Sequence, residues 1–224
     1  MSGPNQYHFR AATFADLDLL KRWQESAHVG RWWGSEDPFA EEELVDPRVY
    51  RWIVSLEQRS FAYMQDYAVH GWGQHHFDYL PEGSRGIDQY IGETQMIGKG
   101  HGTGFIRQRM TELFSRRVPV VATDPHPENH RAIAVYQKVG FKIAGTVQQT
   151  KWGLVFPWLH ALIAASIFAV RRFESVTAVM LQDRPMAALR KLNCPADRSP
   201  NGSKGRWVQR IDATHAWNRS AGVS

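Results

Sequence analysis

The chain has 224 residues and a formal net charge of +5, enough length for one domain with a full core and some further material. Residues 1–150 hold 16 Lys and Arg against 18 Asp and Glu, whereas residues 151–224 hold 11 against 4, so the first part lacks the basic surface that nucleic-acid binding needs. The single cysteine, Cys194, excludes an internal disulfide, and without a signal-peptide pattern at the N-terminus we expect a cytoplasmic protein.

The first half of the chain predicts two strands joined as a hairpin, preceded by a strand and a helix. Residues 7–12 favour the first strand, and Thr13 is a typical N-cap for a helix over about 15–26. The two glycines of segment 29–34 indicate a loop. The predicted hairpin consists of strands 52–56 and 61–69, and the glycine-, histidine- and aromatic-rich residues 70–83 after it are expected to cover a substrate.

The second half alternates between strands and helices. The predicted order is strand 85–91, helix 103–116, strand 118–122, helix 130–139 and the beginning of a strand at 141. Asn129 is placed to cap the second of these helices and Gly140 to end it. This alternation is typical of an α/β fold.

Glycines alternate at positions 98, 100 and 102, directly before the first of these helices. Glycine lets neighbouring N–H groups turn towards one point, and a helix N-terminus adds further donors, so the stretch suits a phosphate or pyrophosphate. A P-loop would need Ser or Thr after Lys99, where Gly100 stands, and the spacing also misses that of a dinucleotide-binding fingerprint.

Two motifs carry a resemblance to a known family. Gln95-x-x-Gly98-x-Gly100 resembles the pyrophosphate-binding signature of the GNAT acetyltransferase superfamily, and Asn129-x-x-Ala132-x-x-x-Tyr136-x-x-x-Gly140-Phe141 resembles its second cofactor motif. Arg31-Trp32-Trp33-Gly34 and Arg85-Gly86-Ile87-Asp88-Gln89 are similar to segments of the aminoglycoside 6′-N-acetyltransferases and their siderophore-synthesis relatives. The resemblance covers about residues 6–150.

The resemblance implies a GNAT fold, an α/β architecture with a mixed central sheet splayed around acetyl-CoA and flanked by helices. The domain would span residues 1–156, and residues 157–224 would form a divergent basic C-terminal extension, partly helical and then disordered. Residues 152–170 contain no Asp, Glu, Lys or Arg. This uncharged segment is long enough for a membrane helix. We favour instead a closing strand at 153–156 and an amphipathic helix at 158–172, and treat the extension as a frame-shifted or fused segment.

The resemblance also assigns roles to individual residues. Asp88 would accept the proton of the acceptor amine, Tyr136 would protonate the leaving thiolate, and a backbone N–H near residues 94–96 would polarise the thioester. The expected cofactor-binding residues are Gln95, Met96, Ile97, Gly98, Lys99, Gly100, His101, Gly102, Thr103 and Asn129. The expected substrate-binding residues are Trp32, Trp33, Tyr67, Asp78, Asp88 and Asp124, with Asp66 and Glu93 as further candidate carboxylates.

Simpler interpretations of several of these residues stay open. Trp32 and Trp33 equally suit core packing, Tyr136 a buried helix position and Asp124 a turn. The pair His75-His76 has no third ligand at a convincing spacing, so we expect no metal.

The implied function is acetyl-CoA-dependent 6′-N-acetylation of a polycationic aminoglycoside, which would confer antibiotic resistance. A siderophore-precursor acyltransferase acting on a hydroxylysine-type amine and an inactive CoA-binding module are the alternatives. We expect no nucleic-acid partner, no membrane association, and a monomer or homodimer.

Overall fold

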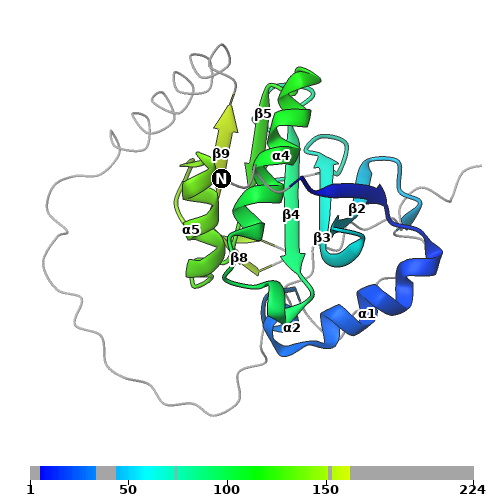
Figure 1. The fold of residues 1–224 in the computed structure, drawn as a ribbon. Coiled ribbons are helices and arrows are strands. Elements are labelled where there is room, and N and C mark those ends of the chain that lie inside the picture. Colours follow the sequence, from blue (N-terminus) through cyan, green and yellow to red (C-terminus); the bar gives the residue numbers. More distant parts are fainter. Residues whose placement is uncertain (1–5, 34–43, 74, 151–152, 162–224) are drawn as a thin grey trace, which may run out of the picture.

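The computed structural model describes residues 6–33, 44–73, 75–150 and 153–161. Its main sheet has seven strands in the order β1-β2-β3-β4-β5-β9-β6 (Figure 1). These are β1 His8–Ala11, β2 Val49–Leu56, β3 Arg59–Ala68, β4 Arg85–Ile91, β5 Val120–Thr123, β9 Trp158–Ala161 and β6 Lys142–Ile143. A separate hairpin pairs β7 Gln148–Thr150 with β8 Gly153–Val155.

The helices are α1 Leu17–Glu25, α2 Ala27–Trp33, α4 His101–Ser115 and α5 His130–Val139, with 3-10 turns η1 Phe14–Asp16 and η2 Thr94–Met96. Alternate residues of the central strands face opposite sides, as the two-residue period of a strand requires. Val54 and Met64 join the apolar side chains of α4, whereas Ile53 and Tyr63 join those of α1 and α2. The sheet therefore lies between two helical layers, as the GNAT resemblance predicts.

The feature of the sheet that positions the site is the divergence of β4 and β5. They are parallel neighbours, but only Arg85 with Val121 and Gly86 with Ala122 are in register. β4 continues for five further residues, to Ile91, and none of the strands that the structure describes pairs with them on that side. The expected splayed sheet is confirmed, and the opening exposes one edge of β4 to whatever lies between the strands.

Local sequence signals account for several elements. The β2–β3 turn consists of Glu57 and Gln58, both with positive φ (48° and 68°), as the tight turn of a twisted hairpin requires. The Asn129 side chain accepts a hydrogen bond from the Ala132 N–H at 3.2 Å and so caps α5, which ends at Gly140 with φ 112°. The predicted hairpin, cap and stop are confirmed.

Two sequence-based predictions are wrong because tertiary packing decides these segments. Residues 29–33, expected as a loop, belong to α2: Val29 is buried beside α1, and Trp33 packs against Tyr90 with ring centroids 5.0 Å apart. These contacts outweigh the low helix propensity of Gly30.

The helix expected from residue 158 is a strand at its start. Trp158–Ala161 forms β9, which pairs with β5 on one side and β6 on the other. Main-chain bonding on both edges and the burial of Trp158 fix this extended conformation. The sheet therefore includes residues beyond the domain end expected at 156, and the rest of the expected extension, 162–224, lies outside the described residues. None of the described helices is long and apolar enough to cross a membrane.

A buried ionic network joins β3, β4 and α4. The fully buried Asp66 carboxylate accepts from Arg85 Nε at 2.5 Å, from Arg109 at 2.7 Å and from Trp52 Nε1 at 2.9 Å. Arg109, itself 1% exposed, also donates to Glu112 at 2.6 Å. Asp66 is thus held by two guanidinium groups inside the fold and is not a substrate-facing carboxylate.

Candidate active site

The glycine-rich stretch forms an anion cradle at the N-terminus of α4. Gly98 and Gly100 have φ of 79° and 85°, a conformation that residues with a side chain rarely adopt. The N-cap residue, Gly100, has no side chain that could cap the helix. The first intrahelical bond runs from Gly104 N–H to Gly100 O at 3.1 Å. The N–H groups of the first turn therefore have no acceptor within the helix, which is the arrangement that binds phosphates.

Side chains in this stretch do other work. His101 turns into the core, where Nδ1 lies 3.1 Å from the Tyr7 hydroxyl, and Met96 packs against the same core. Gln95 is exposed and donates to Glu93 at 2.8 Å. The cradle consequently offers main-chain donors, with the exposed Lys99 side chain as a cation beside them.

Of the oxyanion donors expected near residues 94–96, the Met96 N–H is already bonded within the protein. These residues form the 3-10 turn η2, in which the Met96 N–H is bonded to Glu93 O at 2.9 Å. The unpaired edge of β4, opposite the diverging β5, is where main-chain donors face the opening instead. The expectation assumed that β4 runs straight into the glycines, but the strand ends at Ile91.

A cavity of about 550 Å³ runs from the cradle along the opening between β4 and α5. α2 forms its outer wall. Its lining includes Ile97 and Gly102 of the cradle, Tyr90 and Ile91 of β4, Asn129, Ala132 and Val135 at α5, and His28, Trp32 and Trp33 of α2. A long, partly apolar chain with a phosphate-bearing end fits this channel.

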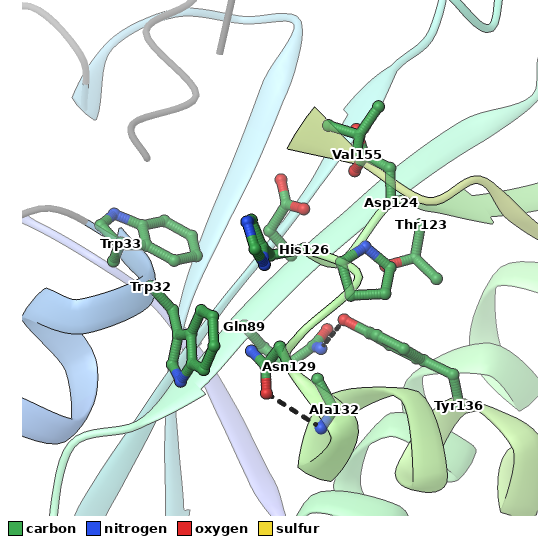
Figure 2. A pocket seen from close by; sticks show the side chains of 12 residues that line it. Trp32, Trp33, Gln89, Thr123, Asp124, His126, Asn129, Ala132, Tyr136 and Val155 are labelled. Carbon is green, nitrogen blue, oxygen red and sulfur yellow. Dashed lines mark hydrogen bonds between the residues drawn. The ribbon is translucent and has the colours of Figure 1, made fainter. Parts of the chain in front are cut away.

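A smaller cavity of about 110 Å³ adjoins the first. The two cavities share Trp32, Trp33, Gln89, Asn129 and Ala132. The smaller one adds Asp88, Thr123, Asp124, Pro125, His126, Tyr136 and Val155. Figure 2 shows the two tryptophans on one side of it and Tyr136 on the opposite side. A group carried in the large cavity can therefore meet a ligand in the small one.

Asp88 is one of the two carboxylates that line the smaller cavity. Its Oδ2 accepts from Gln65 Nε2 at 2.9 Å, and Gln65 is held in turn by the Tyr63 hydroxyl, which donates to Oε1 at 2.8 Å. Burial raises the pKa of Asp88 well above its usual range, the negative charge of Asp124 raises it further, and the Gln65 hydrogen bond opposes both. Such a carboxylate is a stronger base than an exposed one.

Tyr136 lies across the cavity on α5 and is 5% exposed. Its hydroxyl accepts a hydrogen bond from the Gln89 side chain, drawn as a dashed line in Figure 2. Burial raises the pKa of Tyr136 above its ordinary value. The hydroxyl therefore keeps its proton at neutral pH and is available as an acid.

The two tryptophans line both cavities. Trp33 also packs on Tyr63 and Tyr90, so it is in part a core residue. The Trp32 ring lies 5.5 Å from the His126 ring and 4.7 Å from the Arg31 guanidinium carbon. Their role in binding a substrate stays a prediction.

Some predicted residues do not reach this site. Tyr67 is 1% exposed and lies against Gly86, where an added Cβ would meet its ring at 2.1 Å, and it lines neither cavity. Asp78 is exposed and accepts the His75 N–H at 2.7 Å, which closes a turn. Glu93 accepts from Trp23 Nε1 at 2.9 Å. Of the expected carboxylates, Asp88 and Asp124 are the pair that the fold brings to one cavity.

Sequence reasoning missed the residues that act through register or through a loop. Gln65 reaches Asp88 because β3 and β4 pair these two positions directly. His76 reaches Asp124 from the β3–β4 loop, Nε2 to Oδ2 at 2.9 Å. A polar residue inside the apolar strand 61–69 was the available signal for Gln65. Among the described residues, no group of three His, Cys, Asp or Glu is arranged to hold a metal ion.

Comparison with known proteins agrees with this geometry. The family model described as "Acetyltransferase (GNAT) domain" matches residues 13–149. The chain is 33% identical over 153 residues to "Aminoglycoside N(6')-acetyltransferase type 1" of Klebsiella pneumoniae, covering 62% of this chain and 75% of that protein. It is 46% identical over 66 residues to "Kanamycin resistance protein" of Rhizobium radiobacter, covering 29% of this chain and 61% of that protein.

Solved structures extend the similarity to three dimensions. The aminoglycoside acetyltransferase AAC(6')-Ib in complex with coenzyme A has a TM-score of 0.64 and 30% identity, covering 71% of this chain and 96% of that one. The same enzyme with coenzyme A and kanamycin has a TM-score of 0.63 and 29% identity, with the same coverage. The residues that the family model matches, 13–149, include the cradle and the diverging strands, and the chain therefore belongs to the aminoglycoside 6′-N-acetyltransferase family of the GNAT acetyltransferase superfamily.

Proposed function

We propose that this protein transfers the acetyl group of acetyl-CoA to the 6′-amino group of an aminoglycoside and thereby confers resistance to it. The observation that carries the proposal is that a carboxylate, Asp88, and a protonated phenol, Tyr136, line one small cavity, which adjoins the larger channel. Solved relatives with coenzyme A, kanamycin and ribostamycin support this choice of ligands. Because acetyl-CoA is a cytoplasmic metabolite, we place the reaction in the cytoplasm.

The cradle and the channel fit coenzyme A. The main-chain donors of residues 98–103 would hold the diphosphate, and the wall of Asn129, Ala132 and Val135 would lie along the pantetheine arm. The bound cofactor supplies a thioester, whose carbonyl carbon is open to attack by an amine. A main-chain N–H on the unpaired edge of β4 would stabilise the negative charge that develops on the carbonyl oxygen.

The residues of the small cavity manage the protons. An amine of this kind is mostly charged at neutral pH and must lose a proton to attack. Asp88, with its raised pKa, accepts that proton directly or through a water. As the new N–C bond forms and the C–S bond breaks, Tyr136 donates its phenolic proton to the thiolate. No covalent intermediate with the protein is required.

The acidic cavity favours a polycation over the alternative substrate. Asp88 and Asp124 both line it, and two carboxylates attract a molecule with several ammonium groups more strongly than a singly charged amine. The Gln65–Asp88 and Gln89–Tyr136 hydrogen bonds hold the expected base and acid in place. Binding of coenzyme A alone does not require this arrangement, so it favours an active enzyme over an inactive CoA-binding module.

The test is thiol release from acetyl-CoA by the purified full-length protein with kanamycin, tobramycin or a hydroxylysine-type amine as acceptor. We expect turnover with the two aminoglycosides and a single acetyl group on the 6′-nitrogen. Turnover with the hydroxylysine-type amine alone would replace this proposal by siderophore-precursor acylation. Coenzyme A binding without turnover on any acceptor would leave the inactive module.

A further inference from the structure

His76 does not line the small cavity of about 110 Å³, which is called the acceptor cavity below, and it has no role in the proposed reaction. It belongs to the β3–β4 loop, and its Nε2 is 2.9 Å from Oδ2 of Asp124, which directly follows β5. Both side chains are almost completely buried, at 7% and 4% exposure. Asp124 lines the acceptor cavity and His76 does not. The imidazole can therefore influence a ligand there through Asp124.

The two carboxylates of the cavity have partners of different character. Asp88 and Asp124 each stand two positions beyond the last registered pair of β4 and β5, Gly86 and Ala122. Asp88 accepts from the neutral amide of Gln65, whereas Asp124 pairs with an imidazole that can carry positive charge. The two carboxylates of the small cavity are therefore held by different side chains, Asp88 by an amide and Asp124 by an imidazole.

The β3–β4 loop holds the His76 ring in a defined place. The ring stacks on His75 with centroids 4.5 Å apart and 18° between planes, and it contacts the fully buried Phe77 at 4.2 Å. The Asp78 carboxylate closes the same turn through the His75 N–H. Because the His76 ring packs on both neighbours, it loses little conformational freedom in contacting Asp124, so the contact between the two side chains is pre-organised.

We propose that His76 is a positioning residue that orients Asp124, so that Asp124 binds an ammonium group of a polycationic acceptor while Asp88 accepts the proton. This inference rests on the proposed aminoglycoside acetylation and assigns the recognition of a second positive charge to the His76–Asp124 pair. Without His76, Oδ2 of the buried Asp124 loses its 2.9 Å contact with the imidazole, and the carboxylate is no longer held in one orientation toward the substrate.

The test compares His76→Gln, His76→Asn and His76→Phe with the wild type in the full-length protein. The Gln amide nitrogen can reach the place of Nε2, whereas the shorter Asn amide cannot. A misplaced Asp124 carboxylate weakens its charged hydrogen bond to a bound ammonium group, and loss of such a bond corresponds to about a tenfold or larger change in affinity. We expect His76→Asn and His76→Phe to raise the KM for kanamycin about tenfold with kcat within about threefold, and His76→Gln to stay near the wild type.

Three controls separate this role from a structural one. The coenzyme A affinity should be the same in all variants. The KM for a singly charged amine acceptor should rise less than the KM for kanamycin. In an Asp124→Asn background, His76→Asn should add no further loss, because a double-mutant cycle reports action through the partner. If His76→Phe does not fold, the Gln and Asn pair still decides.

Equal KM values for the Gln and Asn variants, or additive losses in the double variant, would overturn the proposal. Calorimetric binding of kanamycin to the protein loaded with coenzyme A provides a readout independent of turnover. A wild type that fails to acetylate kanamycin would refute the proposed function. The effect of His76 on kanamycin binding would still test this inference on its own.

Discussion

Asp88 is the residue whose environment matters most to the chemistry. Burial and the nearby Asp124 raise its pKa, and the Gln65 amide donates to its carboxylate, which lines the smaller cavity. Asp88→Asn keeps the size and removes the base, so we expect kcat to fall by about 10²- to 10⁴-fold. Tyr136→Phe removes the proton donor, and kcat should fall at least about tenfold.

Steady-state thiol release with kanamycin measures both effects. Coenzyme A affinity serves as the control for folding. Neither substitution should change it much, because the cradle lies at the N-terminus of α4, whereas Asp88 is on β4 and Tyr136 on α5. A loss of less than about tenfold in both variants would remove Asp88 and Tyr136 from the acid and base roles.

The pH dependence of turnover follows from the same carboxylate. Because the pKa of Asp88 is raised, its basic form disappears as the pH falls through that raised value, and the acid limb of kcat should lie above the usual Asp range of about 3.9. Asp124→Asn removes one of the two raising causes. The pH profile of kcat, measured at saturating aminoglycoside, should therefore shift to lower pH. An acid limb that stays in place or moves to higher pH would contradict the coupling between the two carboxylates.

Among the elements, the cradle shows how backbone conformation prepares a binding site. At Gly100 an added Cβ would meet no atom within 4 Å, so the cost of Gly100→Ala comes from φ of 85° and from the space that a bound anion needs. Gly83 is a matched control, with φ of 81°, a comparable lack of close neighbours and a position outside both cavities.

Both alanine variants should lose about 1 kcal/mol of unfolding free energy from the left-handed backbone. The Gly100 variant alone should also bind coenzyme A more weakly. Urea unfolding and calorimetric titration with coenzyme A measure the two quantities. Equal coenzyme A affinities in the two variants would argue against diphosphate binding at the cradle.

The network around Asp66 ties three elements together at the core. Asp66→Asn removes the counter-charge that Arg85 and Arg109 share and leaves Arg109 with the 39%-exposed Glu112, so we expect a loss of about 3–5 kcal/mol in unfolding free energy. Asp16→Asn is the comparison, because Asp16 is also buried but its partner Arg10 is 49% exposed, so that solvent screens the pair and the loss should be smaller. Urea denaturation of both variants provides the comparison. Similar losses would mean that the network contributes no more than a surface pair.

The sequence predicts the elements whose signals are local. The β2–β3 hairpin, the Asn129 cap and the glycine cradle follow from a few adjacent residues each. The α2 helix and β9 do not, because contacts with distant parts of the chain decide them. The site divides in the same way: Asp88 and Tyr136 come with linear motifs, whereas Gln65 and His76 depend on strand register and on the path of a loop.

At the scale of the whole molecule, β9 determines where the folded domain can end. It is an internal strand, paired with both β5 and β6. Truncation after residue 156 removes it and should prevent folding, because β5 and β6 would lose their shared partner. Truncation after residue 172 keeps it and should leave acetyl transfer within about twofold of the full chain, if 173–224 contribute nothing to the domain.

Circular dichroism and thiol release compare the two truncated proteins with the full chain. Activity in the protein truncated after residue 156 would show that β9 is dispensable. A large loss of folded protein on truncation after residue 172 would refute the interpretation of the C-terminal segment as a fused or frame-shifted addition.

The most direct test of the whole arrangement is a crystal structure of the protein with coenzyme A and kanamycin. We expect the diphosphate on the N–H groups of residues 98–103, the sulfur beside the Tyr136 hydroxyl and an amino group of kanamycin within hydrogen-bonding distance of Asp88. A diphosphate bound away from the cradle, or an aminoglycoside that leaves Asp88 and Asp124 uncontacted, would contradict the assignment.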